Sequence, residues 1–130
     1  MTILVAYVPR PEGQAALDKA LEIAKERQEH LVVVNAGRDG VHEDASLAEN
    51  WDVERIEARL AQAGVQGKVQ QFVRGKSVLK EIEDLVDTLQ VSLLVIGLRR
   101  RSAVGKLVLG SVARDILLSV PCPVLAVKAH

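Results

Sequence analysis

Five short apolar runs, separated by four segments in which apolar residues recur at helical spacing, most strongly constrain the fold of this 130-residue chain. The runs are Thr2–Val8, Leu31–Ala36, Val69–Val73, Leu93–Leu98 and Pro123–Val127. Most lack alternation, which is typical of parallel strands covered on both faces, whereas Gln70 and Gln71 indicate an edge or half-exposed strand for the third run. The alternation of strands and helices predicts one α/β domain over residues 1–130, with a parallel sheet and helices on both of its faces.

End signals support the predicted helices. Pro11 and Glu12 suit a first helical turn, because a missing amide costs nothing there and an acidic side chain meets the helix dipole. Gly64 stands where a left-handed residue would end the second helix, and Ser77 is expected to cap the third. The fourth helix is expected around Ser111–Ser119.

The composition argues against several classes of partner. Seventeen Lys and Arg balance seventeen Asp and Glu, so the net charge is zero, which disfavours nonspecific binding to nucleic acid or to a membrane surface. Tyr7, Trp51 and Phe72 are the only aromatic residues, too few for a base-stacking module, and we expect Trp51 in the core or at an interface. Cys122 has no second cysteine for a disulfide, and no apolar run reaches the roughly 18 residues of a membrane span. A cytoplasmic protein is the resulting expectation.

Patterns that would indicate an enzyme or a metal site are absent from the sequence. The three histidines, His30, His42 and His130, are scattered without ligand spacing, and Ser111 has no His–Asp context. Cys122 lies between two prolines and is expected to be a buried structural thiol. We therefore expect no metal site and no enzymatic function, with a weak ATPase activity as the alternative left open.

The residues that follow the buried strands are candidates for a ligand site. In parallel α/β sheets the ligand binds beyond the carboxyl ends of the strands, where the strand order reverses. This rule gathers Tyr7–Pro9, Asn35–Gly37 and Gly97–Arg101 around one crevice.

The segment from Gly97 to Ser111 has features that suit a phosphate. Gly97 would let the backbone approach a ligand without a Cβ clash, and a flexible basic loop, Arg99–Gly105, is expected to follow. Gly110 and Ser111 would offer amides and a hydroxyl at a helix N-terminus, where an anion is favoured. A solvated basic loop and an ordinary helix cap are the alternative interpretation of the same spacing.

Three features together resemble the universal stress protein family of the UspA type, over essentially the whole chain. They are the opening strand Ile3–Ala6 with Ala15-Ala16-Leu17 in the next helix, Gly97 thirteen residues before Gly110-Ser111, and the ending Val120–Lys128. The resemblance implies an open five-stranded parallel sheet of order 3-2-1-4-5, Rossmann-like and of the adenine nucleotide alpha hydrolase type. It also implies a homodimer through the last strand, at Val124, Leu125 and Val127.

Members of this family that bind ATP resemble one another in a Gly-x2-Gly-x9-Gly-Ser/Thr loop and an Asp at the end of the first strand. Gly97 and Gly110-Ser111 match this pattern, whereas Arg100 stands at the second glycine and Val8 at the Asp. The resemblance implies a site for ATP or AMP, with Mg²⁺ only beside a triphosphate. Its residues would be Ala6, Tyr7, Val8, Ala36, Ile96, Gly97, Arg99, Arg100, Gly110, Ser111 and Val112.

Two hypotheses about function follow from this pattern. The retained glycines, Ser111 and the arginines favour a regulatory stress-response protein that holds an adenine nucleotide. Val8 and Arg100 favour an interaction protein of the subclass that binds no nucleotide. Arg100 itself has two possible geometries: its side chain fills the triphosphate site, or it turns outward and contacts phosphate.

Overall fold

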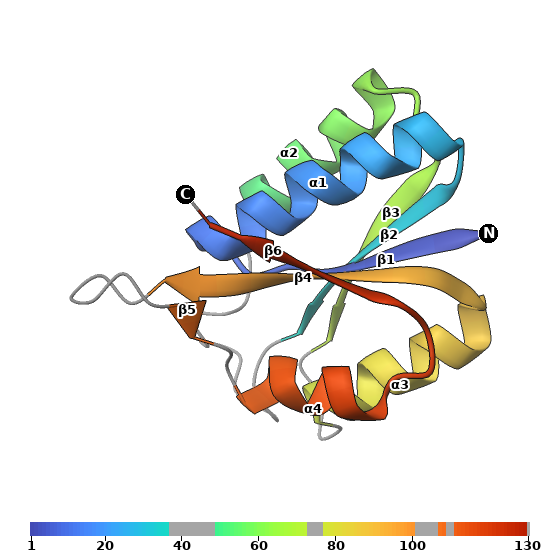
Figure 1. The fold of residues 1–130 in the computed structure, drawn as a ribbon. Coiled ribbons are helices and arrows are strands. Elements are labelled where there is room, and N and C mark those ends of the chain that lie inside the picture. Colours follow the sequence, from blue (N-terminus) through green and yellow to red (C-terminus); the bar gives the residue numbers. More distant parts are fainter. Residues whose placement is uncertain (37–48, 73–76, 101–106, 109–110, 130) are drawn as a thin grey trace.

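The computed structural model describes residues 1–36, 49–72, 77–100, 107–108 and 111–129 (Figure 1). The elements are, in order, β1 (Thr2–Ala6), α1 (Pro11–Arg27), β2 (His30–Ala36), α2 (Asn50–Gln62), β3 (Gly67–Phe72), α3 (Val78–Leu89), β4 (Val91–Arg100), β5 (Leu107–Val108), α4 (Ser111–Ser119) and β6 (Val124–Lys128). The four predicted helices and the five predicted strands are all present, with ends shifted by a few residues.

The five predicted strands form one parallel sheet. β1 lies between β2 and β4, while β3 flanks β2 and β6 flanks β4. Counted in chain order without the short β5, this is the order 3-2-1-4-5. The predicted fold is confirmed, including the edge position of the strand that contains Gln70 and Gln71.

The two-residue strand β5 is absent from the predicted elements. It pairs antiparallel with the end of β4, Val108 opposite Arg99 and Leu107 opposite Arg100. The prediction that a flexible loop begins at Arg99 is therefore wrong, because β4 continues through Arg100 before the chain turns back. The remainder of the predicted basic loop, residues 101–105, lies outside the described residues.

Alternate residues of the central strands supply two hydrophobic layers, one on each face of the sheet. Ile3 and Val5 of β1 pack in a cluster with α1 and α2, whereas Leu4 packs in a second cluster with α3 and α4. Figure 1 shows the same division, with α1 and α2 on one side of the sheet and α3 and α4 on the other. Burial on both faces explains why the strands are apolar without alternation.

Helix α1 lies close to the sheet because its inner face consists of small residues. Ala16, Ala20 and Ala24 recur at helical spacing, and each is at most 1% exposed. Gly13 continues this face into the first turn, where a Cβ would lie 1.8 Å from the carbonyl oxygen of Val8. Only glycine at position 13 therefore permits this approach of α1 to the chain that leaves β1.

A second glycine makes the same contact possible from the side of β4. A Cβ on Gly97 would lie 2.1 Å from the backbone carbonyl oxygen of Glu12 and 3.0 Å from the Glu12 Cβ. The first turn of α1 therefore rests on β4 at Gly97, near the carboxyl end of the strand. The space left by the missing side chain of Gly97 is occupied by Glu12, so on that side it is not open for the expected close approach of a ligand.

The helix ends largely follow the sequence signals. Helix α1 begins at Pro11, the Ser77 hydroxyl accepts from the Lys80 amide at 3.1 Å, and Gly64 has a positive φ of 70° after α2. Trp51 is 67% exposed, so the core alternative for this residue is wrong, whereas an interface position stays a prediction. The residue after it, Asp52, takes the inward-facing position instead.

Substitution of Gly97 by alanine is predicted to destabilise the protein by about 2–3 kcal/mol, because the new methyl group must displace the backbone of Glu12. Gly64→Ala is the matched control, since a Cβ there meets nothing within 4 Å and only its positive φ is strained, at a cost of about 1 kcal/mol. Urea denaturation monitored by circular dichroism measures both free energies of unfolding. A loss for Gly97→Ala no larger than that for Gly64→Ala would contradict this packing.

Candidate functional site

The ends of three neighbouring strands are tied together around Tyr7, directly after β1. The Tyr7 amide donates to the Val34 carbonyl at 2.8 Å, and the Tyr7 carbonyl accepts from the Asn35 side-chain amide at 2.9 Å. Asn35 is fully buried, and its Oδ1 accepts from the Gln71 Nε2 of β3 at 3.0 Å. Tyr7 and Asn35 therefore meet at the carboxyl edge of the sheet, as the topology rule predicts.

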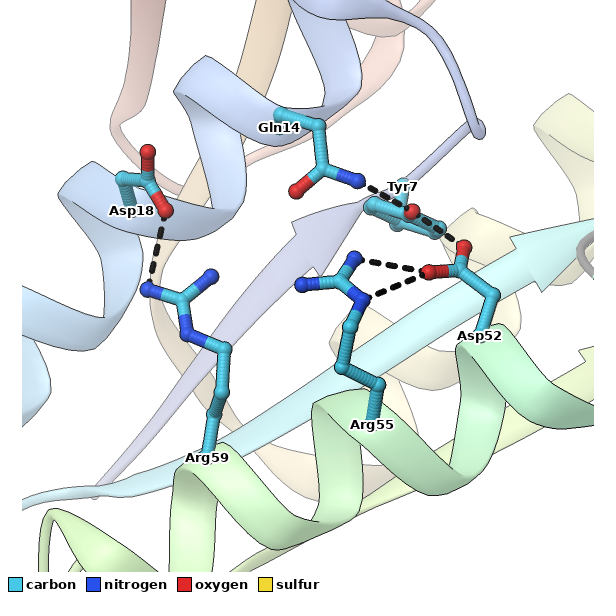
Figure 2. A network of polar contacts seen from close by, with 6 residues as sticks. All are labelled: Tyr7, Gln14, Asp18, Asp52, Arg55 and Arg59. Carbon is cyan, nitrogen blue, oxygen red and sulfur yellow. Dashed lines mark hydrogen bonds and ion pairs between the residues drawn. The ribbon is translucent and has the colours of Figure 1, made fainter.

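The Tyr7 side chain enters the layer between β1, α1 and α2 (Figure 2). Its hydroxyl donates to Oδ2 of Asp52 at 2.5 Å and accepts from Nε2 of Gln14 at 2.8 Å. The Arg55 guanidinium binds Oδ1 of Asp52 through Nη2 at 2.6 Å and Nε at 3.1 Å. Figure 2 shows these four side chains pointing toward one another, Tyr7 from the end of β1, Gln14 from α1, and Asp52 and Arg55 from α2.

This network buries a carboxylate and leaves both of its oxygens hydrogen-bonded. Asp52 is 3% exposed and Tyr7 is 1% exposed, so their side-chain oxygens form hydrogen bonds with protein groups rather than with water. Burial, and then the hydrogen bond to Asp52, raise the pKa of the Tyr7 phenol well above its usual range. The hydroxyl, amide and carbonyl of Tyr7 all have hydrogen-bond partners within the protein, so we assign Tyr7 a structural role at this edge of the sheet.

Neither Asp52 nor Gln14 is among the site residues predicted from the sequence. One signal was available for Asp52: it is spaced by four residues from Ile56 and by eight from Leu60, both of which are buried. A carboxylate on the inward face of a helix requires a buried donor, and Tyr7 is the only tyrosine in the chain. Spacing could thus have identified the buried acid, although not its partners.

The turn between β1 and α1 leads into an ion pair at the start of α1. Val8, at the position of the family's Asp, is half-buried, and its carbonyl accepts from the Arg10 amide at 2.8 Å. Arg10 Nε lies 3.6 Å from Oε2 of Glu12, and their side chains are 38% and 11% exposed. Glu12 is the residue that rests against Gly97, so this ion pair lies where β1, α1 and β4 meet.

The other predicted site residues occupy the ends of several elements. Ala6 ends β1, Ala36 ends β2, Ile96 is 3% exposed within β4, and Arg99 and Arg100 end β4. Ser111 and Val112 open α4, whereas Gly110 lies outside the described residues. The burial of Ile96 in the layer below α3 and α4 leaves its side chain in the core.

Among the described residues, no three His, Cys, Asp or Glu side chains gather where they could hold a metal ion. Within the same ranges no helix has the length and apolar character to cross a membrane. Cys122 is half-buried rather than fully buried, and desolvation raises the pKa of its thiol. Its thiol form is therefore favoured over the reactive thiolate.

We predict that Tyr7 ionises only above pH 10. The pKa of the phenol is raised in the folded protein, so its stabilising contribution is complete below the unfolded pKa of about 10 and is lost as the pH rises beyond it. Because the chain has one tyrosine, the ultraviolet absorbance of tyrosinate reports this residue alone. The same titration in concentrated urea should give a pKa near 10, whereas a folded protein that titrates there would contradict the buried hydrogen bond.

Comparison with known proteins finds relatives that match almost the whole chain. A universal stress protein from Mycolicibacterium smegmatis is 43% identical over 128 residues, covering 98% of each chain. A universal stress protein structure from Archaeoglobus fulgidus is 32% identical, with a TM-score of 0.81 and 98% coverage of each chain. A universal stress protein from the same organism in complex with dAMP is 25% identical, with a TM-score of 0.70 and 98% coverage of each chain.

The family model agrees with these pairwise similarities. The universal stress protein family model matches residues 1–128, almost the whole sequence. The strand order, the residue pattern and the similarity along the full length point to one assignment. This chain belongs to the universal stress protein family.

Proposed function

We propose that this protein is a stress-response regulator that holds an adenine nucleotide, ATP or AMP, beyond the carboxyl ends of β1 and β4. The 5′-phosphates would lie over the amides at the start of α4, at Gly110–Val112. Arg99 and Arg100 would supply countercharge, and Mg²⁺ would accompany only a triphosphate.

The hairpin of β4 and β5 is the observation that carries this proposal. Val108 pairs with Arg99 at the end of β4, and Ser111 opens α4 three residues later. Three residues span at most about 11 Å, so the start of α4 lies within that distance of β5. The amides at a helix N-terminus favour phosphate, which here would lie close to the end of a strand that carries two arginines.

Similarity to the Archaeoglobus fulgidus protein supports the choice of an adenine nucleotide. That protein binds dAMP and shares the fold over nearly its whole length. The present chain retains Gly97, Gly110 and Ser111 of the pattern found in family members that bind ATP. We propose binding rather than catalysis, because both buried carboxylates described near this edge have partners within the protein: Asp52 binds Tyr7 and Arg55, and Glu12 pairs with Arg10.

A second candidate function is an interaction protein that binds no nucleotide. Val8 favours it, because an apolar side chain cannot accept a hydrogen bond from a ribose hydroxyl as an Asp could. The loss of one such bond costs about 0.5–1.5 kcal/mol, which weakens binding without abolishing it. We therefore favour nucleotide binding, and we expect the contacts with the phosphates to contribute most of the binding free energy.

Isothermal titration calorimetry with ATP and adenosine tests whether the phosphates contribute most of the binding free energy. ATP is expected to bind far more than tenfold more tightly than adenosine, and its affinity should fall with added salt, because exposed charge pairs are screened over about 8 Å at physiological ionic strength. In the double variant Val8→Asp, Arg100→Gly, which restores the family pattern, nucleotide binding should be retained, because a new hydrogen bond to the ribose offsets the countercharge lost with Arg100. Arg100→Lys, which keeps the charge, serves as the control.

Each outcome of this titration has one meaning. If the double variant binds ATP and the wild type does not, the protein belongs to the non-binding subclass. If neither protein binds ATP or AMP, the proposed phosphate site is wrong. Equal binding by both would show that Arg100 does not obstruct the site.

We also propose that the protein forms a homodimer through β6. This strand pairs with β4 on one side, and its apolar residues Val124, Leu125 and Val127 are only half-buried within one chain. The Leu94 amide donates to the Pro123 carbonyl, and alternate residues of a strand face the same neighbour. The backbone groups of Leu125 and Val127 therefore face β4, while those of Ala126 face the other side.

Ala126→Pro is expected to shift the protein from dimer to monomer, because proline removes an amide donor from the outer side of β6. Ala126→Val keeps that amide and should leave the dimer intact. Multi-angle light scattering should give twice the chain mass of 14.1 kDa for the wild type and for Ala126→Val. A wild-type particle of single-chain mass at tens of micromolar protein would contradict the proposal.

A further inference from the structure

The backbone oxygens at the end of β1 are already bonded within the protein. The Tyr7 carbonyl accepts from the Asn35 side-chain amide at 2.9 Å, and the Val8 carbonyl accepts from the Arg10 amide at 2.8 Å. A Cβ on Gly13 would lie 1.8 Å from the Val8 carbonyl oxygen and 2.8 Å from the Val8 amide nitrogen, so α1 packs directly on this backbone. The Val8 backbone is therefore held in place and cannot turn its carbonyl toward a ligand.

Two carboxylates lie close to the end of β1, and both are directed to donors of the protein. Asp52 binds Tyr7 through one oxygen and Arg55 through the other, and it is 3% exposed. Glu12 pairs with Arg10, and its side chain is 11% exposed. In dinucleotide-binding folds an acidic residue accepts the hydrogen bond of a ribose hydroxyl. These two carboxylates are buried and paired, so neither takes that role here.

Val8 itself offers a ligand only methyl groups. The residue is half-buried, so part of it is exposed at the edge where the proposed nucleotide lies. Its carbonyl is bonded and its backbone is covered by Gly13, which leaves the isopropyl group as the part that can meet a ligand. A hydroxyl that packs against methyl groups loses its water and gains no acceptor, which disfavours binding. A deoxyribose carbon in the same place loses no hydrogen bond and buries apolar surface.

We infer that this protein does not select for the ribose hydroxyl, and that it binds deoxyadenosine nucleotides at least as tightly as the corresponding ribonucleotides. The inference rests on the proposed nucleotide site and specifies the sugar of its ligand. A carboxylate at the end of β1, as in the pattern of family members that bind ATP, would favour the ribose. The isopropyl group of Val8 removes that preference and leaves the phosphate contacts unchanged.

Isothermal titration calorimetry measures this preference with ATP, 2′-deoxy-ATP and 3′-deoxy-ATP, and with the three corresponding monophosphates. Within each series the base, the phosphates and the net charge are the same, so the affinity ratios report the two hydroxyls alone. The wild type should bind each deoxynucleotide within about threefold of the ribonucleotide or more tightly, because no hydrogen bond is lost with the hydroxyl.

Val8→Thr and Val8→Asp test the residue, and Val8→Leu is the matched control. Threonine has nearly the shape of valine and adds a hydroxyl acceptor, whereas aspartate adds a carboxylate. Both variants should bind the ribonucleotide about threefold to tenfold more tightly than one of the two deoxynucleotides, because the ribose hydroxyl now has an acceptor. Val8→Leu stays apolar and should keep the wild-type ratios. Ratios within one variant cancel any uniform repulsion between a new carboxylate and the phosphates.

Three results would overturn the inference. If the wild type binds the ribonucleotide more than about threefold more tightly than either deoxynucleotide, another group accepts the ribose hydroxyl, although the proposed nucleotide function stands. If Val8→Thr and Val8→Asp both keep the ratios of Val8→Leu, Val8 does not face the ribose. If neither the triphosphates nor the monophosphates bind the wild type, the inference and the proposed function fail together.

Discussion

The close contact of the first turn of α1 with both β1 and β4 determines the geometry of the rest of this edge. The missing side chain of Gly13 admits the Val8 carbonyl, and that of Gly97 admits the Glu12 carbonyl. Backbone packs directly on backbone at both points, so the turn between β1 and α1 is held against the end of β4. The Arg10–Glu12 ion pair owes its position between the two strands to this contact.

A polar network supports the same turn from the side of α2. The Tyr7 hydroxyl, the Asp52 carboxylate and the Arg55 guanidinium satisfy one another in a layer otherwise filled by aliphatic side chains. A half-satisfied network of this kind would be costly in a low dielectric, so the relative placement of β1 and α2 is specified more tightly than apolar contacts alone would require. Gln14 extends the network to α1, so Tyr7 at the end of β1 is hydrogen-bonded to side chains of both α1 and α2.

The parallel sheet and the four helices could be predicted from the sequence, because apolar runs and helical spacing depend on which residues are buried. The sequence did not predict β5, since a two-residue strand has no periodicity and exists only through its pairing with Arg99 and Arg100. Gly97 was predicted to let a ligand approach closely, because glycine has no side chain. In the structure the group that approaches Gly97 is the backbone of Glu12. Trp51 and Asp52 show the limit of hydrophobicity as a guide, because the acid is buried through its partners and the tryptophan is exposed.

The central claim is that the carboxyl edge of β1 and β4 holds an adenine nucleotide. The most direct test is mass spectrometric identification of the small molecules released by acid from the protein purified out of the cells that produce it. We predict an adenine nucleotide in near-stoichiometric amount with the wild type and a strongly reduced amount with Gly110→Val, whose branched side chain would meet the phosphates. Preparations that release no adenine nucleotide, or the same amount from both proteins, would contradict the claim.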